Sequence, residues 1–138
     1  MRFMILVKAS AESEAGVMPT EHELTEMGRY NEELVRAGVL LAGEGLHPTS
    51  RGARVRFEDG KRTVTDGPFG GTEELLAGFW LIQVKSREEA VEWVKRIPFH
   101  EGEVEIRQVF EAEDFGAEFT PEMRAQEERL RGEIEAQQ

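Results

Sequence analysis

The sequence predicts an α+β domain of the ferredoxin-like type, with the order strand, helix, strand, strand, helix, strand. Three observations lead to this fold class: short apolar runs suited to strands, two segments of helical spacing between them, and an Asp-Gly turn that marks an inserted hairpin. The chain has 138 residues, of which 39% are hydrophobic, enough for one modest core. We therefore expect one domain over residues 1–116 and a C-terminal helical extension over 117–138.

The first strand is expected at residues 2–8, where the run RFMILVK favours an extended backbone. The small and acidic residues that follow, up to Pro19, predict a loop. Thr20 and Glu23 then form a capping box at the start of a helix, and Gly38 ends that helix. The stripe expected to face the core comprises Leu24, Met27, Asn31, Leu34 and Val35, with Tyr30 beside it.

The second strand is expected at residues 39–46 (VLLAGEGL), which run into glycines. Residues 53–57 and 61–65 flank Glu58-Asp59-Gly60, and an Asp-Gly pair between two such runs is a strong hairpin signal. Residues 66–71 contain three Gly and one Pro, which predicts a loop.

The second half of the chain repeats the pattern of strand, helix and strand. Residues 78–85 (GFWLIQVK) predict a strand, and Ser86 with Glu89 predicts a second capping box before a helix that Pro98 stops. Residues 103–110 alternate as a sheet strand does. The tail from Thr120 is expected to be helical, with little apolar surface.

The two strands expected at the centre of the sheet are apolar on both of their faces, whereas a half-solvated sheet has one polar face. These residues are Phe3, Ile5 and Val7 opposite Met4 and Leu6 in the first strand, and Phe79 and Leu81 opposite Trp80, Ile82 and Val84 in the third core strand. With both helices on one face, the other face would leave a patch of several hundred Å² wet, which is unusual for a monomer. We expect a homodimer through this open sheet face; the tail helix folding back is the alternative cover.

Charge and composition exclude several classes of partner. The formal net charge is −11 and the pI about 4.8, so the chain is repelled by phosphate backbones and nucleic acid is not an expected partner. The first apolar run is too short for a signal peptide or a membrane span, and there are no cysteines, so we expect a cytoplasmic protein without membrane association. Three His and no Cys, without an HxH or HExxH pattern, predict no metal site and no cofactor.

Asp66, Glu44 and His47 are the candidate catalytic residues. Asp66 is suited to act as a general base from its loop, or to cap the turn that Gly67-Pro68 imposes. Glu44 and His47 flank glycines that let a ligand approach the backbone closely, and a carboxylate beside an imidazole makes an acid–base pair. The structural alternative for both is a polar surface loop.

Two stretches resemble the DGPF subgroup of the YCII-related proteins: Thr65-Asp66-Gly67-Pro68-Phe69, and Glu73-Glu74-Leu75-Leu76-Ala77-Gly78-Phe79-Trp80. Further matches are Ala42-Gly43-Glu44-Gly45-Leu46, the helix over 86–97, and Glu105-Ile106-Arg107-Gln108-Val109-Phe110-Glu111. The resemblance covers residues 1 to about 116. It implies a dimeric α/β-barrel fold and, because many members are encoded beside extracytoplasmic-function sigma factors, a regulatory or stress-related setting with a link to such a system.

Some smaller relatives in the wider family are similar to enzymes with a His–Asp pair on the first helix, and one branch eliminates chloride from an aromatic ring. By spacing to Gly38, the pair would fall near Met27 and Arg36, and the expected helix contains no Asp. Three functions follow from the residues and the resemblance together. The first is a dimeric module that binds a small molecule or a protein partner, the second a small lyase or isomerase using Glu44, His47 or Asp66, and the third, from fold analogy, a haem or oxygen-dependent enzyme.

Overall fold

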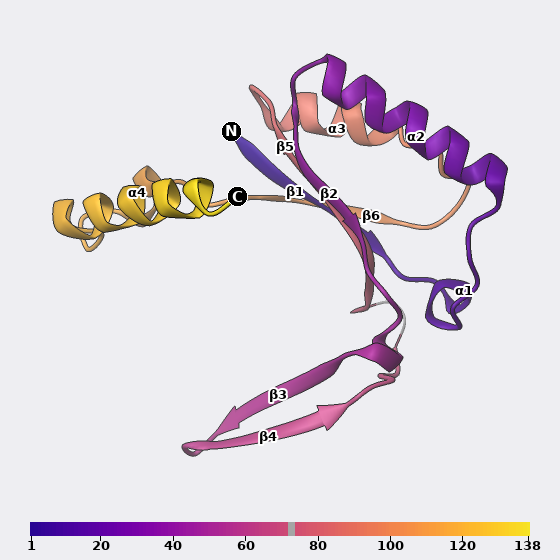
Figure 1. Ribbon diagram of the computed structural model, residues 1–138, viewed down its shortest axis with the longest axis horizontal. Helices are drawn as coiled ribbons and strands as arrows, with labels where there is room; N and C mark the ends of the chain where they lie inside the picture. The colour runs from indigo at the N-terminus through magenta and orange to yellow at the C-terminus, as the bar shows by residue number, and fades with distance from the viewer. Residues whose placement is uncertain (72–73) are drawn as a thin grey trace. The chain divides into compact units, whose positions relative to one another are not determined.

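The computed structural model describes residues 1–71 and 74–138 (Figure 1). The chain divides into two compact units, Met1–Gln108 and Val109–Gln138. The first unit holds the sheet, three of the helices and the hairpin, and the second holds the C-terminal helix. The division falls eight residues before the domain boundary expected at residue 116.

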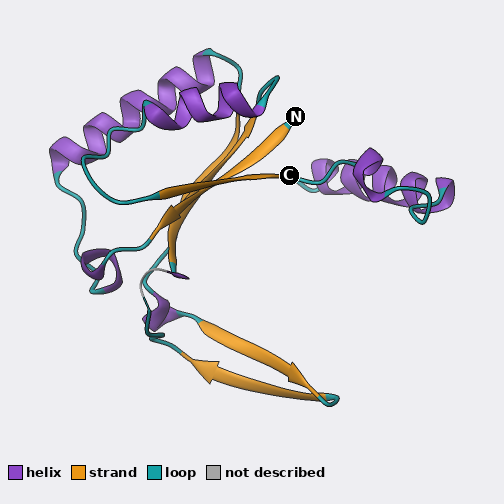
Figure 2. Ribbon diagram, turned by 180° about the vertical axis from the view of Figure 1, so that it is seen from behind, coloured by secondary structure: helices purple, strands orange, loops and turns teal. Residues whose placement is uncertain are grey.

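The first unit is built on a four-stranded antiparallel sheet in the order β2-β5-β1-β6. Its strands are β1 (Arg2–Lys8), β2 (Leu40–Gly45), β5 (Leu76–Gln83) and β6 (Val104–Gln108). The helices α2 (Glu21–Arg36) and α3 (Arg87–Lys95) cover one face of the sheet, as Figure 2 shows from behind. The predicted ferredoxin-like α+β class is confirmed, and β1 and β5 are the central strands.

The core lies between these helices and the sheet. Its most buried side chains come from β1, α2 and β5, and the complete buried cluster is Phe3, Ile5, Tyr30, Leu34, Val39, Trp80, Ile82, Val84, Ala90 and Ile97. The prediction of the core stripe is wrong for two residues, because Leu24 is 56% exposed and Val35 is 63% exposed. The stripe centres on Met27, Tyr30 and Leu34, so a period of 3.6 residues places Leu24 and Val35 at its borders.

The capping residues explain where the helices begin. The Glu23 N–H donates to the Thr20 hydroxyl at 3.1 Å, and the Thr20 N–H donates to the Glu23 carboxylate at 3.0 Å, as predicted. At α3 the second box is only half formed, because the Glu89 carboxylate accepts from the Lys85 N–H instead of the Ser86 N–H.

The segment before Pro19, predicted to be a loop, contains the one-turn helix α1 (Ala11–Glu14). Ser10 and Ser13 cap it through reciprocal hydrogen bonds between hydroxyls and backbone N–H groups. A helix of four residues without a buried side chain has no hydrophobic period, which is why the sequence pattern missed it.

The predicted hairpin forms a separate two-stranded sheet of β3 (Ala53–Glu58) and β4 (Lys61–Asp66), preceded by the 3₁₀ turn η1 (Thr49–Arg51). Asp59 and Gly60 have φ values of 49° and 76°. Two successive residues with positive φ form the tight turn that an Asp-Gly pair favours.

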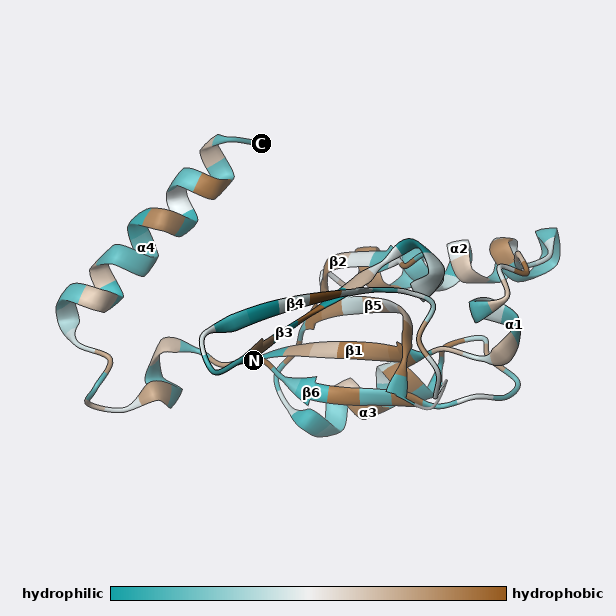
Figure 3. Cartoon of the chain, turned by 90° about the horizontal axis from the view of Figure 1, so that it is seen from below, coloured by the Kyte–Doolittle hydropathy of each residue, from teal (hydrophilic) through white to brown (hydrophobic). Residues whose placement is uncertain are grey.

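The second unit consists of the 3₁₀ turn η3 (Ala112–Phe115) and α4 (Pro121–Ala136). Phe115 stacks on Phe110 at 4.9 Å between ring centroids and contacts Phe119 at 5.2 Å. The tail is helical, as predicted; Thr120 caps α4, Pro121 occupies its first turn, and most of α4 is polar in Figure 3. Among the residues described, we find no helix that has both the length and the apolar character to cross a membrane.

Candidate functional site

An apolar pocket of about 300 Å³ lies between α2 and the sheet of the first unit. Its walls come from the ends of β1, β2 and β5, from α2 and from the segment after α3. The lining residues are Val7, Pro19, Met27, Asn31, Gly43, Glu44, Gly45, Ala77, Gly78, Phe79, Trp80 and Phe99. A concave, mainly apolar site with aromatic walls and few polar groups is typical of small-molecule sites.

Trp80 is the central aromatic side chain of this pocket and is held from three sides. Its indole N–H donates to the Asn31 side-chain oxygen at 2.9 Å, and its ring meets Tyr30 edge-on at 5.5 Å and Phe99 at 6.4 Å. A Cβ on Gly43 would lie 2.8 Å from the Trp80 ring, closer than real Cβ contacts. Gly43 is therefore required by the position of the indole, and the ring presents a fixed wall to the pocket.

Tyr30 supports the same wall from the core. Its hydroxyl donates to the backbone oxygen of Trp93 at 2.7 Å, which ties α2 to α3. Burial raises the pKa of Tyr30 to about 12, so the side chain is neutral at physiological pH. Tyr30 thus acts as a structural hydrogen-bond donor.

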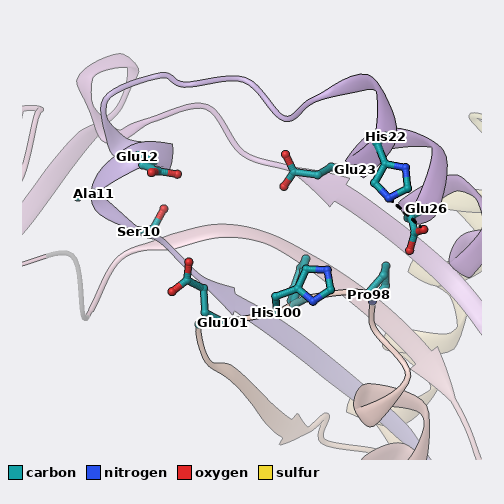
Figure 4. A pocket seen from close by; sticks show the side chains of 11 residues that line it. Ser10, Ala11, Glu12, His22, Glu23, Glu26, Pro98, His100 and Glu101 are labelled. Carbon is teal, nitrogen blue, oxygen red and sulfur yellow. Dashed lines mark ion pairs between the residues drawn. The ribbon is translucent and has the colours of Figure 1, made fainter.

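A second pocket, of about 580 Å³, lies beside the first, and because most of its lining residues are polar or charged we call it the polar pocket. Figure 4 shows His22 and Glu26, joined as an ion pair, on the α2 side and His100 and Glu101 across from them. The Nε2 of His22 lies 3.3 Å from the Glu26 carboxylate. The full lining is Ser10, Ala11, Glu12, His22, Glu23, Glu26, Pro98, Phe99, His100, Glu101 and Gly102. Phe99 lines both pockets.

The lining of the polar pocket has four carboxylates, two imidazoles and no Lys or Arg. Glu23 is engaged in the α2 cap, where the hydrogen bond from the Thr20 N–H lowers the pKa of its carboxyl, with the Thr20 hydroxyl adding to the effect. The remaining groups can accept hydrogen bonds or exchange protons with a bound molecule. Within residues 1–71 and 74–138, however, no three His, Asp or Glu side chains are placed to hold a metal ion.

The structure does not bring the three predicted site residues together in either of the two pockets described. Glu44 lines the apolar pocket, whereas His47 and Asp66 line neither this pocket nor the polar one. His47 contacts the Arg51 guanidinium at 3.4–3.5 Å, and Asp66 is the last residue of β4, paired with Ala53. All three residues are exposed, and their catalytic roles stay predictions.

The side chain of Glu44 is directed by the sheet register. Glu44 pairs with Phe79, which pairs with Leu6, and cross-strand partners share a face of the sheet. Gly43 and Gly45, one residue to either side, pair with the helix-facing row of Trp80 and Gly78. Glu44 therefore borders the pocket with its backbone, while its carboxylate projects from the opposite, open face.

The Asp-Gly-Pro-Phe stretch anchors the base of the hairpin. The Thr49 hydroxyl donates to the Glu14 carboxylate at 2.6 Å and accepts from the Phe69 N–H at 3.0 Å. A Cβ on Gly67 would lie 1.7 Å from the Thr49 backbone oxygen, so only glycine fits. The motif thus has a structural role. Its partners Glu14 and Thr49 could not be recognised from the sequence, because no local pattern marks them. Glu73, which is part of the resemblance, lies outside the described residues.

Comparison with known proteins gives a family, one relative in sequence and one similar solved structure. The family model described as YCII-related domain matches residues 1–113. An uncharacterised protein of Rhizobium meliloti (strain 1021) is 35% identical over 75 residues, which is 54% of this chain and 60% of that protein. The matched region thus spans less than two thirds of the curated relative.

A solved structure is also similar. It is the 5-chloro-2-hydroxyhydroquinone dehydrochlorinase of Burkholderia phenoliruptrix AC1100, in complex with 2,5-dihydroxybenzoquinone. The match has a TM-score of 0.40 and 16% sequence identity, and covers 82% of this chain and 98% of that one.

Proposed function

The chain belongs to the YCII-related domain family, and from this premise we propose that it is a homodimeric binding protein for a small, uncharged, ring-shaped molecule. The observation that carries the proposal is the apolar pocket of about 300 Å³ between α2 and the sheet, with Trp80 as a fixed wall. The regulatory or stress-related setting expected from the resemblance is part of this proposal, including its link to a sigma-factor system.

The chemistry of the lining favours a flat and weakly polar ligand. Trp80 and Phe99 offer aromatic surfaces, Met27 offers an adaptable thioether, and Gly45 leaves room for close approach to the backbone. A ring of one or two cycles matches a cavity of this size.

Binding is favoured over acid–base catalysis in this pocket because of its charge inventory. Among the described residues of the lining, Glu44 is the one ionisable residue, and the register directs its carboxylate to the open face. A general base must lie within hydrogen-bond reach of the proton that it removes. The apolar pocket is therefore suited to hold a molecule without transforming it.

The open face of the sheet supports the homodimer. Paired rows place Met4 beside Leu81 and Leu6 beside Phe79 on the face that the helices do not cover, and β1 is predominantly apolar in Figure 3. At roughly 25 cal/mol per Å², covering several hundred Å² in each copy would offset the entropy lost on association. Sedimentation velocity should find dimers, and Leu6→Glu should dissociate them, whereas Glu105→Gln in the same row should not.

Fluorescence of a variant with Trp80 as its only tryptophan tests the binding site. In Trp93→Phe, nitrobenzene should quench Trp80 in a saturable manner, beyond the linear quenching of free tryptophan. Gly45→Val should abolish the saturable part, because Gly45 lines the pocket on the helix-facing row and a Cβ there meets no atom within 4 Å, which leaves the valine side chain to fill that space. Gly28→Val, on α2 but outside the pocket lining, is the matched control. Linear quenching throughout would contradict the proposal.

A second candidate function is a lyase or isomerase reaction in the polar pocket, for which the His22–Glu26 pair is the supporting observation. An imidazole beside a carboxylate can transfer protons near neutral pH. If so, a small ketone such as cyclohexanone should exchange its α-carbon protons for solvent deuterium faster in the presence of the native protein. His22→Gln should stop that exchange, and absence of exchange with native protein would leave binding alone.

A further inference from the structure

The hairpin of β3 and β4 exposes two chemically different faces. Each of its twelve strand residues is exposed. By the register, Val55 faces Val64 and Phe57 faces Arg62 on one side, while Arg54, Arg56, Thr63 and Thr65 lie on the other. The first side is apolar apart from Arg62 and, at its base, Asp66, and the second is polar, with more cationic than anionic residues.

The apolar side is large for so small an element. Val55, Phe57 and Val64 are 49%, 69% and 63% exposed. Together they leave roughly 300 Å² of apolar surface in water, about the size of the largest patch on a typical monomer. Arg62 lies over the Phe57 ring at 5.1 Å and covers part of it.

Two anchors hold the base of the hairpin. The Gly67 N–H donates to the Gly52 oxygen at 3.0 Å, and the Arg54 guanidinium stacks on the Phe69 ring at 3.9 Å. A two-stranded hairpin without further packing is at best marginally stable in water. An anchored, regular hairpin with one apolar side is therefore expected to pack that side on another surface.

The charge of the hairpin indicates what kind of surface its apolar side packs on. The hairpin carries four cationic and three anionic residues, a net charge of +1. Since the formal net charge of the whole chain is −11, the residues outside the hairpin together carry −12. The charged hairpin residues are Arg54, Arg56, Glu58, Asp59, Lys61, Arg62 and Asp66. On the apolar side itself, the cation is Arg62, which lies over Phe57, and it is attracted to an acidic surface such as a second copy of this chain provides.

We propose that the hairpin is a dimerisation arm. Its side formed by Val55, Phe57 and Val64 packs on a surface of a second copy of this chain. The inference rests on the homodimer proposed above and adds a second contact region to it. An apolar patch of roughly 300 Å² is well short of the roughly 800 Å² per partner that stable interfaces bury. The arm therefore supplements the open sheet face and does not form an independent interface.

Spin labels provide a direct test, because the chain has no cysteine and a single introduced thiol is labelled cleanly. A nitroxide at Val64→Cys reports the apolar side, and one at Thr63→Cys, the next residue on the opposite side, is the matched control. We expect the Val64 label to be immobilised at protein concentrations where sedimentation velocity finds dimers and mobile on dilution to monomers. The Thr63 label should be mobile in both states.

The outcomes separate this inference from the proposed dimer. A mobile Val64 label in an established dimer overturns the arm and leaves the dimer intact. Monomers at every concentration overturn both. A label that is immobilised in the monomer would show that the chain itself covers the hairpin. A label that is immobilised only after a DNA duplex is added would assign the hairpin to nucleic acid. Either result overturns the proposal.

A pair of substitutions tests the energetics. Phe57→Ser should raise the dimer dissociation constant about tenfold or more, because the ring loses its contact in both halves of a symmetric pair. Arg56→Ser, the neighbouring residue on the opposite side, should change it by less than about threefold. Both residues are exposed in the single chain, so an unchanged melting temperature of the monomer verifies folding. Equal effects of the two substitutions would refute the arm.

Discussion

Raising the pH above about 10 is expected to weaken the first unit through the ionisation of Tyr30. The side chain is 5% exposed and its hydroxyl donates to the Trp93 backbone oxygen. Burial raises its pKa to about 12; Glu33 adds to the rise, and Arg96 opposes it. The phenolate would lose both its hydration and its hydrogen bond, so the folded state favours the protonated form.

The difference between the folded and unfolded pKa fixes the magnitude. An unfolded tyrosine ionises near pH 10, and the folded side chain ionises near pH 12. Because the folded pKa is higher, the stabilisation is fully present below about pH 10 and is lost as the pH rises through about 12. Two pH units correspond to roughly 3 kcal/mol of unfolding free energy, a large part of the stability of a typical domain.

Two measurements check this reasoning. Tyr30 is the only tyrosine, so the ultraviolet absorbance of phenolate reports its ionisation directly. Urea unfolding of the wild type and of Tyr30→Phe should show the wild type more stable by about 1–3 kcal/mol at neutral pH, because the variant leaves the Trp93 oxygen without its donor. That advantage should disappear towards pH 12. A phenolate that titrates near pH 10 while the fold stays intact would refute the argument.

Three substitutions test the core, the α2 cap and the pocket wall. Leu34→Ala should lower the unfolding free energy by roughly 2–5 kcal/mol in urea titrations, because Leu34 is 1% exposed, and a loss below about 1 kcal/mol would contradict its place in the core. Thr20→Ala should cost about 1 kcal/mol through the lost helix cap, with Thr20→Ser restoring most of it in the same assay. Gly43→Ala should displace the Trp80 ring, shift its fluorescence emission and cost about 1–3 kcal/mol, whereas Gly45→Ala, with free space around its Cβ, should leave the emission unchanged.

Much of the fold follows from local sequence signals. The run from Arg2 to Lys8 gives β1 with its predicted bounds, and the Asp59-Gly60 turn gives the hairpin, because backbone preference and turn chemistry act over a few residues. The short helix α1 escaped prediction because a single turn without buried side chains has no hydrophobic period.

The candidate site was predictable only in part. The glycine-flanked end of β2 does border a pocket, as expected from Glu44, yet the Glu44 carboxylate lies on the other face of the sheet. The wall that matters is formed by Trp80, Asn31 and Gly43, which are far apart in the chain. No local pattern relates them, since their proximity depends on the packing of α2 on the sheet.

The sequence by itself determined the order of the strands and of the three long helices, the two apolar sides of the central strands and the positions where those helices begin, because these depend on side-chain period and on hydrogen bonds between near neighbours. The tertiary structure decided which residues meet in each pocket. His22 and His100, 78 residues apart, line the polar pocket, while of Glu44 and His47, three residues apart, only Glu44 lines the apolar pocket. The physical reason is that the sheet register and the helix packing bring distant residues together and turn neighbouring ones to opposite faces.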